Sequence, residues 1–468
     1  MKNLSVIPMP DKYEFLNGEA EINCEKLVCR IDSSLQKEEY ILTLSQDEFT
    51  LTGGSENAIF YGKQTVRQLG SKHPCVRIHD KPAYSYRGFH IDTARHIFTV
   101  DELKKFIDAA ANLKMNTMHW HLTDDQGFRM EVSRRPELAE KGSVRKKSNF
   151  GSLKEYGPYG GYFTTAQMKE IVAYCAEKFI TVIPEFDIPG HSSALLHVHP
   201  ELTCSGNPVE IKSRQGIFKD IFCAGKEETF EMIFAVLEEL LEIFPSEYIH
   251  IGGDEAPKDN WKNCPDCQKR IRENGLRNEE ELQGWFTNRI VEFLESKGRK
   301  ALVWNESLKS GLISNSVTVQ QWMDRKNLSV DFANKGGKII VSDFFHYYCD
   351  YPYSMTPLSK TYNFSPILKG IRRPENIIGV EGALWTEYIN NFDRLCYMAF
   401  PRYAAIAESG WTKEENKNLA DFKNRFASYS KFLSGIGINS APLEESCPSP
   451  AKRISKTVQF FWNNYVTK

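Results

Sequence analysis

From Arg87 onward the sequence alternates short apolar segments with longer segments of helical, amphipathic periodicity. The apolar segments suit buried parallel strands, and alternation of this kind is typical of repeated βα units. Eight such units over roughly 300 residues predict an α/β fold, a (β/α)8 TIM barrel. A doubly wound open sheet is the alternative, but no GxGxxG motif follows a predicted strand. The predicted strands are GFHIDT (88–93), NTMHWHL (116–122), ITVIPEFD (180–187), EYIHIGG (247–253), ALVWNE (301–306), VTVQQW (317–322), KIIVSD (338–343) and IGVEGALW (378–385).

The residues before this alternation predict a separate unit. Short β-rich runs are followed by a glycine-containing turn and by a segment in which Ile59, Val66 and Leu69 recur near helical spacing. We therefore expect a small α+β N-terminal domain over residues 1–83. The TIM barrel, with a C-terminal helical tail, is expected over residues 84–468.

Charge and hydropathy narrow the possible partners. The chain of 468 residues carries 59 basic and 61 acidic side chains, and this balance argues against a nucleic-acid binder. An apolar run of 18 residues is absent, so we expect no membrane partner. The N-terminal residues show no secretory signal, which favours a cytoplasmic location. A periplasmic or secreted location stays open if a signal peptide has been removed.

The cysteines give little indication of a metal site. Cys264 and Cys267 form the single CxxC motif among 11 cysteines, whereas a zinc site usually requires a second such pair. The sequence therefore predicts no metal. Cys204 and Cys223 lie in a polar stretch and could form a disulfide in an oxidising compartment.

The ends of the predicted strands carry an unusual set of side chains. In a TIM barrel these ends converge on one mouth, where enzyme sites are built. Acids and tryptophans recur there, and because tryptophan rings stack on sugar rings while carboxylates accept hydrogen bonds from hydroxyls, we expect a carbohydrate site. The residues are Asp92, Arg95, His119, His121, Asp124, Asp125, Glu185, Asp187, His191, Asp254, Glu255, Trp304, Glu306, Trp322, Asp343, Trp385 and Glu387.

The most informative motif is HIGGDE, residues 250–255. Neighbouring residues of a regular strand point to opposite faces, so Asp254 and Glu255 can share a site only where glycines let the backbone turn. Two close carboxylates cannot both ionise cheaply, and one pKa should rise. The result would be a proton donor beside a fixed anion, as glycoside hydrolysis requires. The alternative is a solvated acidic loop with Asp254 as a helix N-cap.

A second motif, His119-Trp120-His121, leaves a metal-dependent hydrolase open. Both histidines face the same side of a strand and could bind a metal together with Asp124 or Asp125. The later strand ends offer carboxylates and tryptophans rather than further histidines. We therefore favour the interpretation that these histidines hydrogen-bond neighbouring acids and keep the barrel mouth rigid.

Taken together, several motifs resemble those of the family-20 glycoside hydrolases, the β-N-acetylhexosaminidases. The resemblance extends from the N-terminal domain to about residue 412. It is carried by YRGFHIDTARH, NTMHWHLTDDQGFRMEV, IPEFDIPGH, HIGGDE and ALWTE. It implies an exo-acting, retaining hydrolase that removes terminal β-GlcNAc, with β-GalNAc as a further candidate, without a cofactor. The chain would act on a glycan as a monomer or homodimer.

The resemblance also implies roles for individual residues. Glu255 would be the acid and base. Asp254 would hold the acetamide nitrogen of a substrate whose own 2-acetamido oxygen is the nucleophile, giving an oxazolinium intermediate. Three implied substrate-binding residues contact sugar hydroxyls: Arg87 the 3- and 4-hydroxyls, and Asp350 and Glu387 the 4- and 6-hydroxyls. Tyr348 would donate a hydrogen bond to the acetamide oxygen, and Asp124 and His191 would tune the acid. Trp304, Trp322 and Trp385 would form the walls of the acetamide pocket and contact the sugar ring.

One position departs from the family pattern. Many relatives have a further tryptophan after the tyrosine motif, on the leaving-group side, and this chain has YPYSMTPLSKTYNF there. Tyr353 or Tyr362 is the expected substitute. Two alternatives therefore stay open: a lacto-N-biosidase-type hydrolase of the same family, and a non-catalytic carbohydrate-binding barrel, against which the presence of both acids argues.

Overall fold

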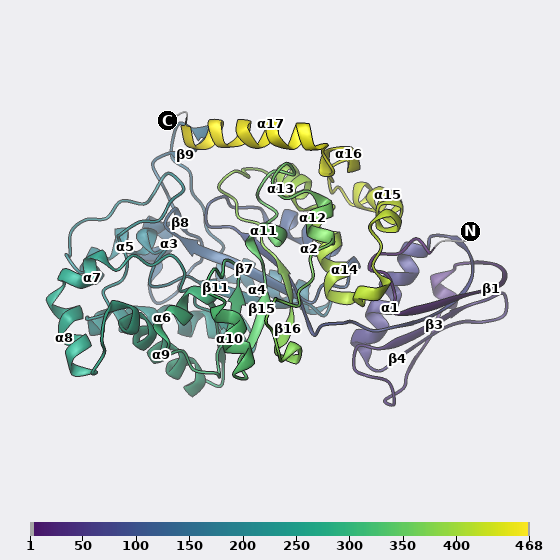
Figure 1. The fold of residues 1–468 in the computed structure, drawn as a ribbon, viewed down its shortest axis with the longest axis horizontal. Coiled ribbons are helices and arrows are strands. Elements are labelled where there is room, and N and C mark those ends of the chain that lie inside the picture. Colours follow the sequence, from purple (N-terminus) through teal and green to yellow (C-terminus); the bar gives the residue numbers. More distant parts are fainter. Residues whose placement is uncertain (1–3, 467–468) are drawn as a thin grey trace.

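A computed structural model describes residues 4–466. Residues 1–3 and 467–468, which belong to the predicted N-terminal domain and C-terminal tail, lie outside the described residues. A mixed five-stranded sheet of order β1-β5-β3-β4-β2 and helix α1 form the N-terminal unit, at the right of Figure 1. Its elements are β1 (Lys12–Glu21), β2 (Val28–Ile31), β3 (Tyr40–Leu44), β4 (Phe49–Gly53), α1 (Glu56–Leu69) and β5 (Lys72–Asp80).

Eight parallel strands form a closed barrel, which confirms the predicted TIM barrel. The pairing runs from β6 through β7 and β11 to β16, and β16 pairs back to β6. Each predicted strand segment overlaps one barrel strand. The strands are β6 (Tyr86–Asp92), β7 (Thr117–Asp124), β11 (Thr181–Phe186), β12 (Tyr248–His250), β13 (Lys300–Trp304), β14 (Thr318–Gln321), β15 (Lys338–Val341) and β16 (Ile377–Gly382). A short strand, β8 (Gly127–Phe128), pairs antiparallel with β7.

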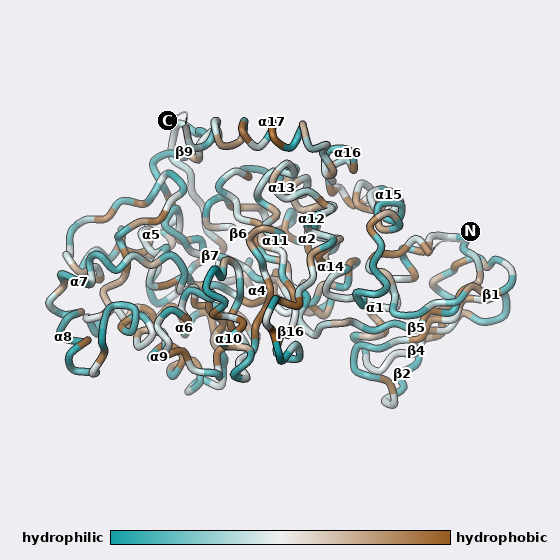
Figure 2. Tube along the Cα trace, viewed as in Figure 1, coloured by the Kyte–Doolittle hydropathy of each residue, from teal (hydrophilic) through white to brown (hydrophobic). Residues whose placement is uncertain are grey.

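Helices surround the barrel, and local sequence signals fix several of their starts. Thr99 and Thr164 each form a capping box with the residue three positions later, at the N-termini of α2 and α4. The longer helices are α2 (Val100–Asn112), α4 (Thr165–Ala176), α6 (Glu227–Ile243), α9 (Glu279–Ser296), α13 (Phe392–Ala399) and α14 (Arg402–Trp411). Figure 2 shows hydrophobic segments along the barrel strands and hydrophilic stretches on the outer loops.

Shorter elements lie in the connections between strands and helices. They are α3 (Pro136–Gly142), β9 (Ser148–Phe150), β10 (Leu153–Glu155), α5 (Ser193–Val198), α7 (Asp259–Asn263), α8 (Pro265–Glu273), α10 (Leu328–Asn334), α11 (Phe344–Tyr347) and α12 (Leu358–Tyr362). Short 3₁₀-helical segments are η1 (Cys24–Lys26), η2 (Pro200–Leu202), η3 (Asn305–Ser310), η4 (Pro374–Asn376) and η5 (Glu414–Asn416).

Buried ion pairs join the N-terminal sheet to the base of the barrel. Arg87, near the start of β6, donates to Glu38 at 2.8 and 3.3 Å and to the carbonyls of Lys114 and Tyr84. The Lys114 ammonium lies 2.9 Å from Asp80 on β5. Each side-chain nitrogen of these buried cations therefore has an acceptor within the protein, which offsets their desolvation.

The C-terminal tail returns from the barrel wall to the barrel mouth. It consists of α15 (Leu419–Gly435), α16 (Leu443–Ser446), α17 (Pro450–Phe461) and a π-helical turn, η6 (Trp462–Val466). Helix α17 runs along the upper edge of the view in Figure 1. Phe460 packs against Tyr351 and Tyr388, and the Asn464 side chain accepts a hydrogen bond from Ser152 N–H at 2.9 Å. Among residues 4–466, we find no helix with the length and apolarity needed to cross a bilayer.

Candidate active site

A pocket of about 430 Å³ opens at the C-terminal ends of the barrel strands. Nine of the eleven predicted site residues line it: Asp124, His191, Asp254, Glu255, Trp322, Tyr348, Asp350, Trp385 and Glu387. Arg87 and Trp304 do not. The remaining lining comes from Arg95, Asp187, Gln215, Gly216, Ile217, Met323, Phe344, Tyr351, Tyr388 and Tyr465. Arg95 and Asp187 are among the strand-end residues that the sequence indicated, whereas the rim tyrosines Tyr388 and Tyr465 are not.

The turn after β12 brings two neighbouring acids to the same pocket. Gly252 and Gly253 have φ angles of 64° and 102°, and a Cβ at Gly252 would lie 1.6 Å from a carboxylate oxygen of Asp187. A side chain is therefore excluded at Gly252. Glu255 itself has a φ of 43°, a conformation that non-glycine residues seldom adopt and that is often found at functional sites. The backbone reversal that HIGGDE predicted is present.

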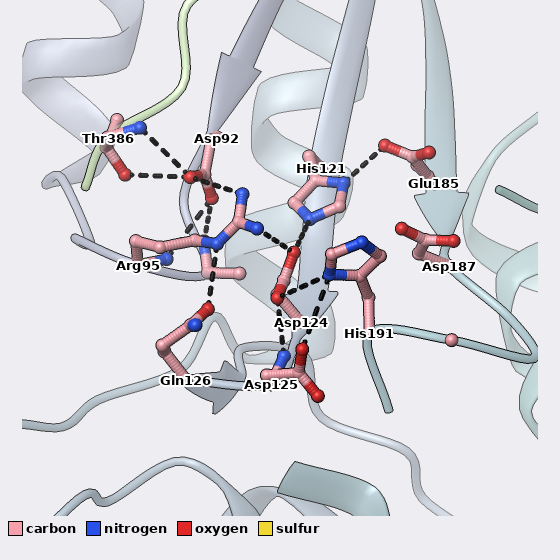
Figure 3. Close-up of polar contacts among 12 residues, drawn as sticks. Asp92, Arg95, His121, Asp124, Asp125, Gln126, Glu185, Asp187, His191 and Thr386 are labelled. Atoms are coloured by element: carbon pink, nitrogen blue, oxygen red, sulfur yellow. Dashed lines mark hydrogen bonds and ion pairs between the residues drawn. The ribbon is translucent and has the colours of Figure 1, made fainter. Parts of the chain in front are cut away.

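His191 connects this pair of acids to a second pair. Its Nδ1 lies 3.2 Å from Asp124 and 3.4 Å from Asp125, and its Nε2 lies 3.8 Å from Asp254 and 3.6 Å from Glu255. Figure 3 shows the ring lying beside the Asp124 carboxylate and facing Asp187. Burial lowers the pKa of His191, but the charges of Asp124 and Asp187 outweigh burial and raise that pKa well above its usual value. The His191 ring thus lies between the Asp124–Asp125 pair and the Asp254–Glu255 pair.

The predicted rise in pKa falls on Asp254. Burial raises the pKa of this carboxyl to about 7, against the opposing charge of His191 and with a further contribution from the charge of Glu255. Its Oδ1 makes no hydrogen bond to any residue in the range 4–466. A buried carboxylate with an unsatisfied oxygen is suited to accept a hydrogen bond from a bound molecule.

Asp187 is one of the strand-end residues that the sequence placed at the barrel mouth, but the family resemblance gave it no role. Its Oδ1 accepts a hydrogen bond from Gly253 N–H at 3.3 Å, and burial together with the charge of Asp254 raises its pKa well above the usual range. A signal was present, because IPEFDIPGH places this acid at the end of the third barrel strand. It contacts the backbone that carries the catalytic pair and so fixes the turn.

The prediction for Arg87 is wrong, and Arg95 occupies the expected place. Arg87 lies at the opposite end of β6, where it pairs with Glu38. Arg95 follows the C-terminal end of the same strand and lies 2.6 Å from Asp124 and 3.1 Å from Asp92 (Figure 3). Its guanidinium also lies 5.1 Å from the Trp385 ring. The motif YRGFHIDTARH contains both arginines. Because strand β6 runs between them, Arg87 lies at the base of the barrel and Arg95 lies at its mouth.

Aromatic side chains form one wall of the pocket. The Trp322 and Tyr348 rings stack with centroids 6.0 Å apart, and Trp385 lies 6.3 Å from Tyr348. Trp304 lies behind this wall rather than in it. It is only 1% exposed, and its indole N–H donates to Glu185 at 2.7 Å. The predicted role of Trp304 as a wall is therefore corrected to support from the barrel interior.

A network of histidines and carboxylates fills the barrel below the pocket. His119 lies 2.8 Å from Glu381 and 3.2 Å from Glu185, and His121 contacts Glu185 and Asp124. Burial lowers the pKa of His119, but the charges of Glu381 and Glu185 raise it to about 9. Both nitrogens of each histidine face carboxylates. These contacts with neighbouring acids agree with the structural interpretation of the HxH motif.

The two tyrosines expected to replace the missing tryptophan lie elsewhere. The Tyr353 hydroxyl donates to the carbonyls of Tyr397 and Phe400, and the Tyr362 hydroxyl donates to Glu408 at 2.7 Å. Neither tyrosine lines the pocket. The aromatic rim is instead formed by Tyr388 and Tyr465, whose hydroxyls lie 3.0 Å apart. Tyr465 belongs to the C-terminal tail, so local motif spacing could not have indicated it.

A closed barrel whose mouth holds an acid pair beside an aromatic-walled pocket suits a glycoside hydrolase. Comparison with known families agrees, and the chain belongs to glycosyl hydrolase family 20. The catalytic-domain model of that family matches residues 84–414, and the model of its domain 2 matches residues 24–81. The two matches meet close to the predicted domain boundary.

Individual relatives carry the same description. The chain is 37% identical to a beta-hexosaminidase of Porphyromonas gingivalis over 86% of this chain, which spans 55% of that relative's length. It is 33% identical to a beta-hexosaminidase of Akkermansia muciniphila, with 92% of this chain and 90% of the relative covered. The similarity to these relatives identifies the protein as a glycoside hydrolase of the β-N-acetylhexosaminidase type.

Solved structures extend the likeness to the whole fold. A crystal structure of a beta-N-acetylhexosaminidase superposes with a TM-score of 0.89 at 31% identity, over 96% of this chain and 99% of the other. A beta-hexosaminidase of Streptomyces plicatus, solved as a mutant in complex with the product GlcNAc, superposes with a TM-score of 0.82 at 27% identity, over 95% and 97% of the two chains.

Proposed function

We propose that the protein is an exo-acting, retaining β-N-acetylhexosaminidase that hydrolyses terminal non-reducing β-GlcNAc by substrate-assisted catalysis. The observation that carries the proposal is the turn after β12, which presents Asp254 and Glu255 side by side to a pocket walled by Trp322, Tyr348 and Trp385. Glycosidases of this kind are an exception to the usual scheme of an acid and a separate enzymic nucleophile.

In the proposed mechanism Glu255 protonates the glycosidic oxygen while the acetamide oxygen of the substrate attacks the anomeric carbon. The leaving group departs as an alcohol, and an oxazolinium ion remains. Glu255, now a carboxylate, then removes a proton from water as that water attacks the anomeric carbon, and the acetamide is regenerated. Holding an internal nucleophile in place is worth ~7–11 kcal/mol in favourable intramolecular reactions.

Asp254 has the properties that this mechanism asks of it. Its free Oδ1 can accept the acetamide N–H, and the anion can offset the positive charge that develops on the acetamide nitrogen. The pKa of about 7 in the unliganded pocket means that part of the population is protonated near neutral pH. A hydrogen bond from the acetamide to the anion favours the ionised form, so substrate binding should lower this pKa.

The sugar hydroxyls have candidate partners on the opposite side of the pocket. Arg95 supplies donors, while Asp350 and Glu387 supply acceptors, and one oxygen of Asp350 has no hydrogen-bond partner among the described residues. Burial raises the pKa of Asp350 well above its usual range, and the charge of Glu387 adds to this. We assign these three residues to the 3-, 4- and 6-hydroxyls of the terminal sugar. Tyr388 and Tyr465 would contact the leaving group.

A panel of aryl β-glycosides tests the proposal. We expect cleavage of 4-nitrophenyl β-GlcNAc, slower cleavage of the β-GalNAc epimer, and no measurable cleavage of the β-glucoside, which lacks the nucleophile. A thiazoline that mimics the oxazolinium ion should inhibit competitively. Preferential cleavage of an aryl lacto-N-bioside would instead support the lacto-N-biosidase alternative, and binding of chitobiose without turnover would support a non-catalytic barrel.

The remaining expectations concern partners. The proposed partner is a glycan or glycoconjugate with terminal β-N-acetylhexosamine. The monomer or homodimer state stays a prediction, as do the absence of nucleic-acid and membrane partners and the cytoplasmic location. Light scattering on the eluting protein decides the oligomeric state, because a tetramer or larger assembly would contradict it.

A further inference from the structure

Four cysteines, a CxxC pair and two single residues from an earlier loop, meet beside the active-site loops. The Cys204 and Cys267 sulfurs lie 3.8 Å apart, Cys223 and Cys264 lie 3.7 Å apart, and Cys223 and Cys267 lie 3.5 Å apart. All four sulfurs lie within 4.8 Å of one another. Cys223, Cys264 and Cys267 are buried, and Cys204 is half-buried.

These distances match the edges of a tetrahedron around a thiophilic metal. A zinc–sulfur bond of about 2.3 Å places the sulfurs of a tetrahedral site about 3.8 Å from one another. Two disulfides would instead divide the four sulfurs into two bonded pairs. The Cys223 sulfur lies at nearly equal distances from the Cys264 and Cys267 sulfurs, so the geometry favours neither as a disulfide partner of Cys223.

The backbone around the four cysteines allows close contact between the loop that carries Cys223 and the N-terminus of α8. Cys264 is the N-cap of α8, and Cys267 lies in its first turn, so the positive end of the helix dipole faces the sulfurs. A Cβ at Gly225 would lie 2.3 Å from the carbonyl carbon of Asp266, which excludes a side chain there. The Gly225 N–H in turn hydrogen-bonds to the Cys223 sulfur. Hydrogen bonds of this type orient and stabilise metal-bound thiolates.

A cation lies close to the loop that carries Cys204. The Lys226 ammonium donates to the carbonyls of Glu201 and Thr203 at 2.7 Å each. Four thiolates and one divalent metal carry a net charge of −2, so a nearby ammonium and a helix N-terminus both reduce the cost of this charge.

We propose that Cys204, Cys223, Cys264 and Cys267 bind one Zn²⁺ ion as a structural site. All four coordination positions would be filled by the protein, which is typical of structural rather than catalytic zinc. The thiols lose their protons to solvent on binding, and the chemistry involves no oxidation or reduction. The expectation of no metal relied on the lack of a second CxxC motif. The fold supplies the other two ligands singly instead, from the loop between α5 and α6.

The site would join two loops that frame the active-site pocket. The loop between α5 and α6 contributes Gln215, Gly216 and Ile217 to the pocket, and its Phe222 N–H donates to Pro189 at 3.1 Å, two residues before His191. Trp261, from the connection that follows the catalytic pair, donates its indole N–H to the Phe222 carbonyl at 2.8 Å. Zinc would fasten these segments together at the end of the molecule distant from the N-terminal sheet, where α7 and α8 lie in Figure 1.

The metal content of the purified protein tests this proposal without any reference to activity. We expect one zinc per chain by elemental mass spectrometry after dialysis against a weak chelator, and release of that zinc when a mercurial reagent titrates the thiols. Cys204→Ser should lower the zinc retained in competition with a chromophoric chelator by at least about tenfold. Cys447→Ser, at another half-buried cysteine, is the matched control and should retain zinc fully.

Two results would overturn the proposal. One is a chain without zinc whose cysteines all titrate as free thiols in denaturant. The other is a chain without zinc in which some of these four cysteines do not titrate and the intact mass is lower by two hydrogens per bond, because this would show disulfides. Iron in place of zinc would overturn the choice of metal. If Cys204→Ser does not fold, the stoichiometry and thiol-linked release in the wild-type protein still decide the question.

Discussion

The two ends of strand β6 carry arginines that are eight positions apart and have opposite roles in the molecule. Arg87, at the base of the barrel, directs its guanidinium donors to Glu38 and to backbone carbonyls, and it lies over Trp411. Arg95, at the mouth, pairs with Asp92 and Asp124 but also lines the pocket. The comparison teaches that the end of the strand, rather than the motif, decides whether a buried arginine stabilises the fold or reaches a ligand.

The same contrast holds for the polar groups around the two arginines. At the base, Lys114 and Asp80 satisfy each other. At the mouth, Asp254 and Asp350 each keep an oxygen without a hydrogen bond within the part of the chain that the structure describes. Functional sites commonly sacrifice stability in this way. Variants at the mouth should therefore lose activity at little cost in stability, and variants at the base should do the reverse.

The largest expected effect follows the loss of the acid at the mouth. Glu255→Gln should lower kcat for chitobiose by at least about 10³-fold, because the sugar leaving group needs a proton. The loss should be smaller for a 2,4-dinitrophenyl glycoside, whose leaving group departs unprotonated. Stopped assays on both substrates measure the difference. Glu306→Gln, a neighbouring carboxylate outside the pocket lining, is the control, and near-wild-type turnover of both substrates by Glu255→Gln would refute the assignment.

Asp254→Asn should separate activity from stability. We expect a loss of about 10²–10³-fold in kcat, as for removal of one preorganised charge-stabilising group. The pKa of Asp254 in the folded protein is about 7, above its usual 3.8. Its contribution to stability is therefore present below the unfolded pKa and is lost as pH rises through about 7.

Asp254→Asn replaces a buried carboxylate with a neutral side chain, so the variant avoids the free-energy cost of burying that charge. The Tm of Asp254→Asn should exceed that of the wild type by a few degrees at pH 8, and the two proteins should converge near pH 4. Thermal scans at both pH values check this. A variant that is less stable than the wild type at pH 8 would mean that Asp254 is a structural anion.

The paired arginine variants address the comparison directly. Arg87→Gln breaks a buried ion pair and should cost about 3–5 kcal/mol of unfolding free energy while kcat and KM stay within about twofold. Arg95→Gln should raise KM and lower kcat/KM by at least about 10²-fold, because it removes a charged donor from the pocket. Denaturant titrations and steady-state kinetics on each variant measure both quantities. Impaired sugar binding in Arg87→Gln, with Arg95→Gln unaffected, would contradict the assignment of the sugar contact to Arg95.

The smallest expected effect lies at the rim. Tyr465→Ala removes an aromatic side chain from the leaving-group side and should raise KM for chitobiose by about three- to tenfold, as expected for loss of one stacking contact. KM for a small aryl glycoside should change less. Tyr388→Phe, which removes only the hydroxyl that contacts Tyr465, is the matched control. Equal changes on both substrates would argue that the tail only supports the pocket.

The sequence allowed the barrel and most of the pocket to be predicted because both depend on local patterns. Strand periodicity located all eight strands, and the two glycines before Asp254 indicated the turn that the structure contains. Residues whose role depends on distant contacts could not be placed in this way. Tyr465 reaches the pocket through a tail that packs across the barrel mouth, and Cys204 meets Cys267 across 63 positions of sequence.

Arg87 and Trp304 show a different limit. Arg87 lies within YRGFHIDTARH, a motif that spans a whole strand and does not say which end faces the pocket, and Trp304 lies near the end of the predicted strand ALVWNE. The alternation of side chains in β13 directs Trp304 toward Glu185 in the barrel interior. Only the closed barrel, with its two distinct ends, settles such positions.

In the proposed mechanism the 2-acetamido oxygen of the substrate is the nucleophile. Successive fluorination of the acetyl group probes this oxygen without any change to the protein. We predict that kcat/KM for 4-nitrophenyl 2-acetamido glycosides falls steeply and log-linearly from the acetyl through the monofluoro- and difluoro- to the trifluoroacetyl substrate, because each fluorine weakens the carbonyl oxygen as a nucleophile. The same kcat/KM for all four substrates would contradict the claim and would require a nucleophile supplied by the protein.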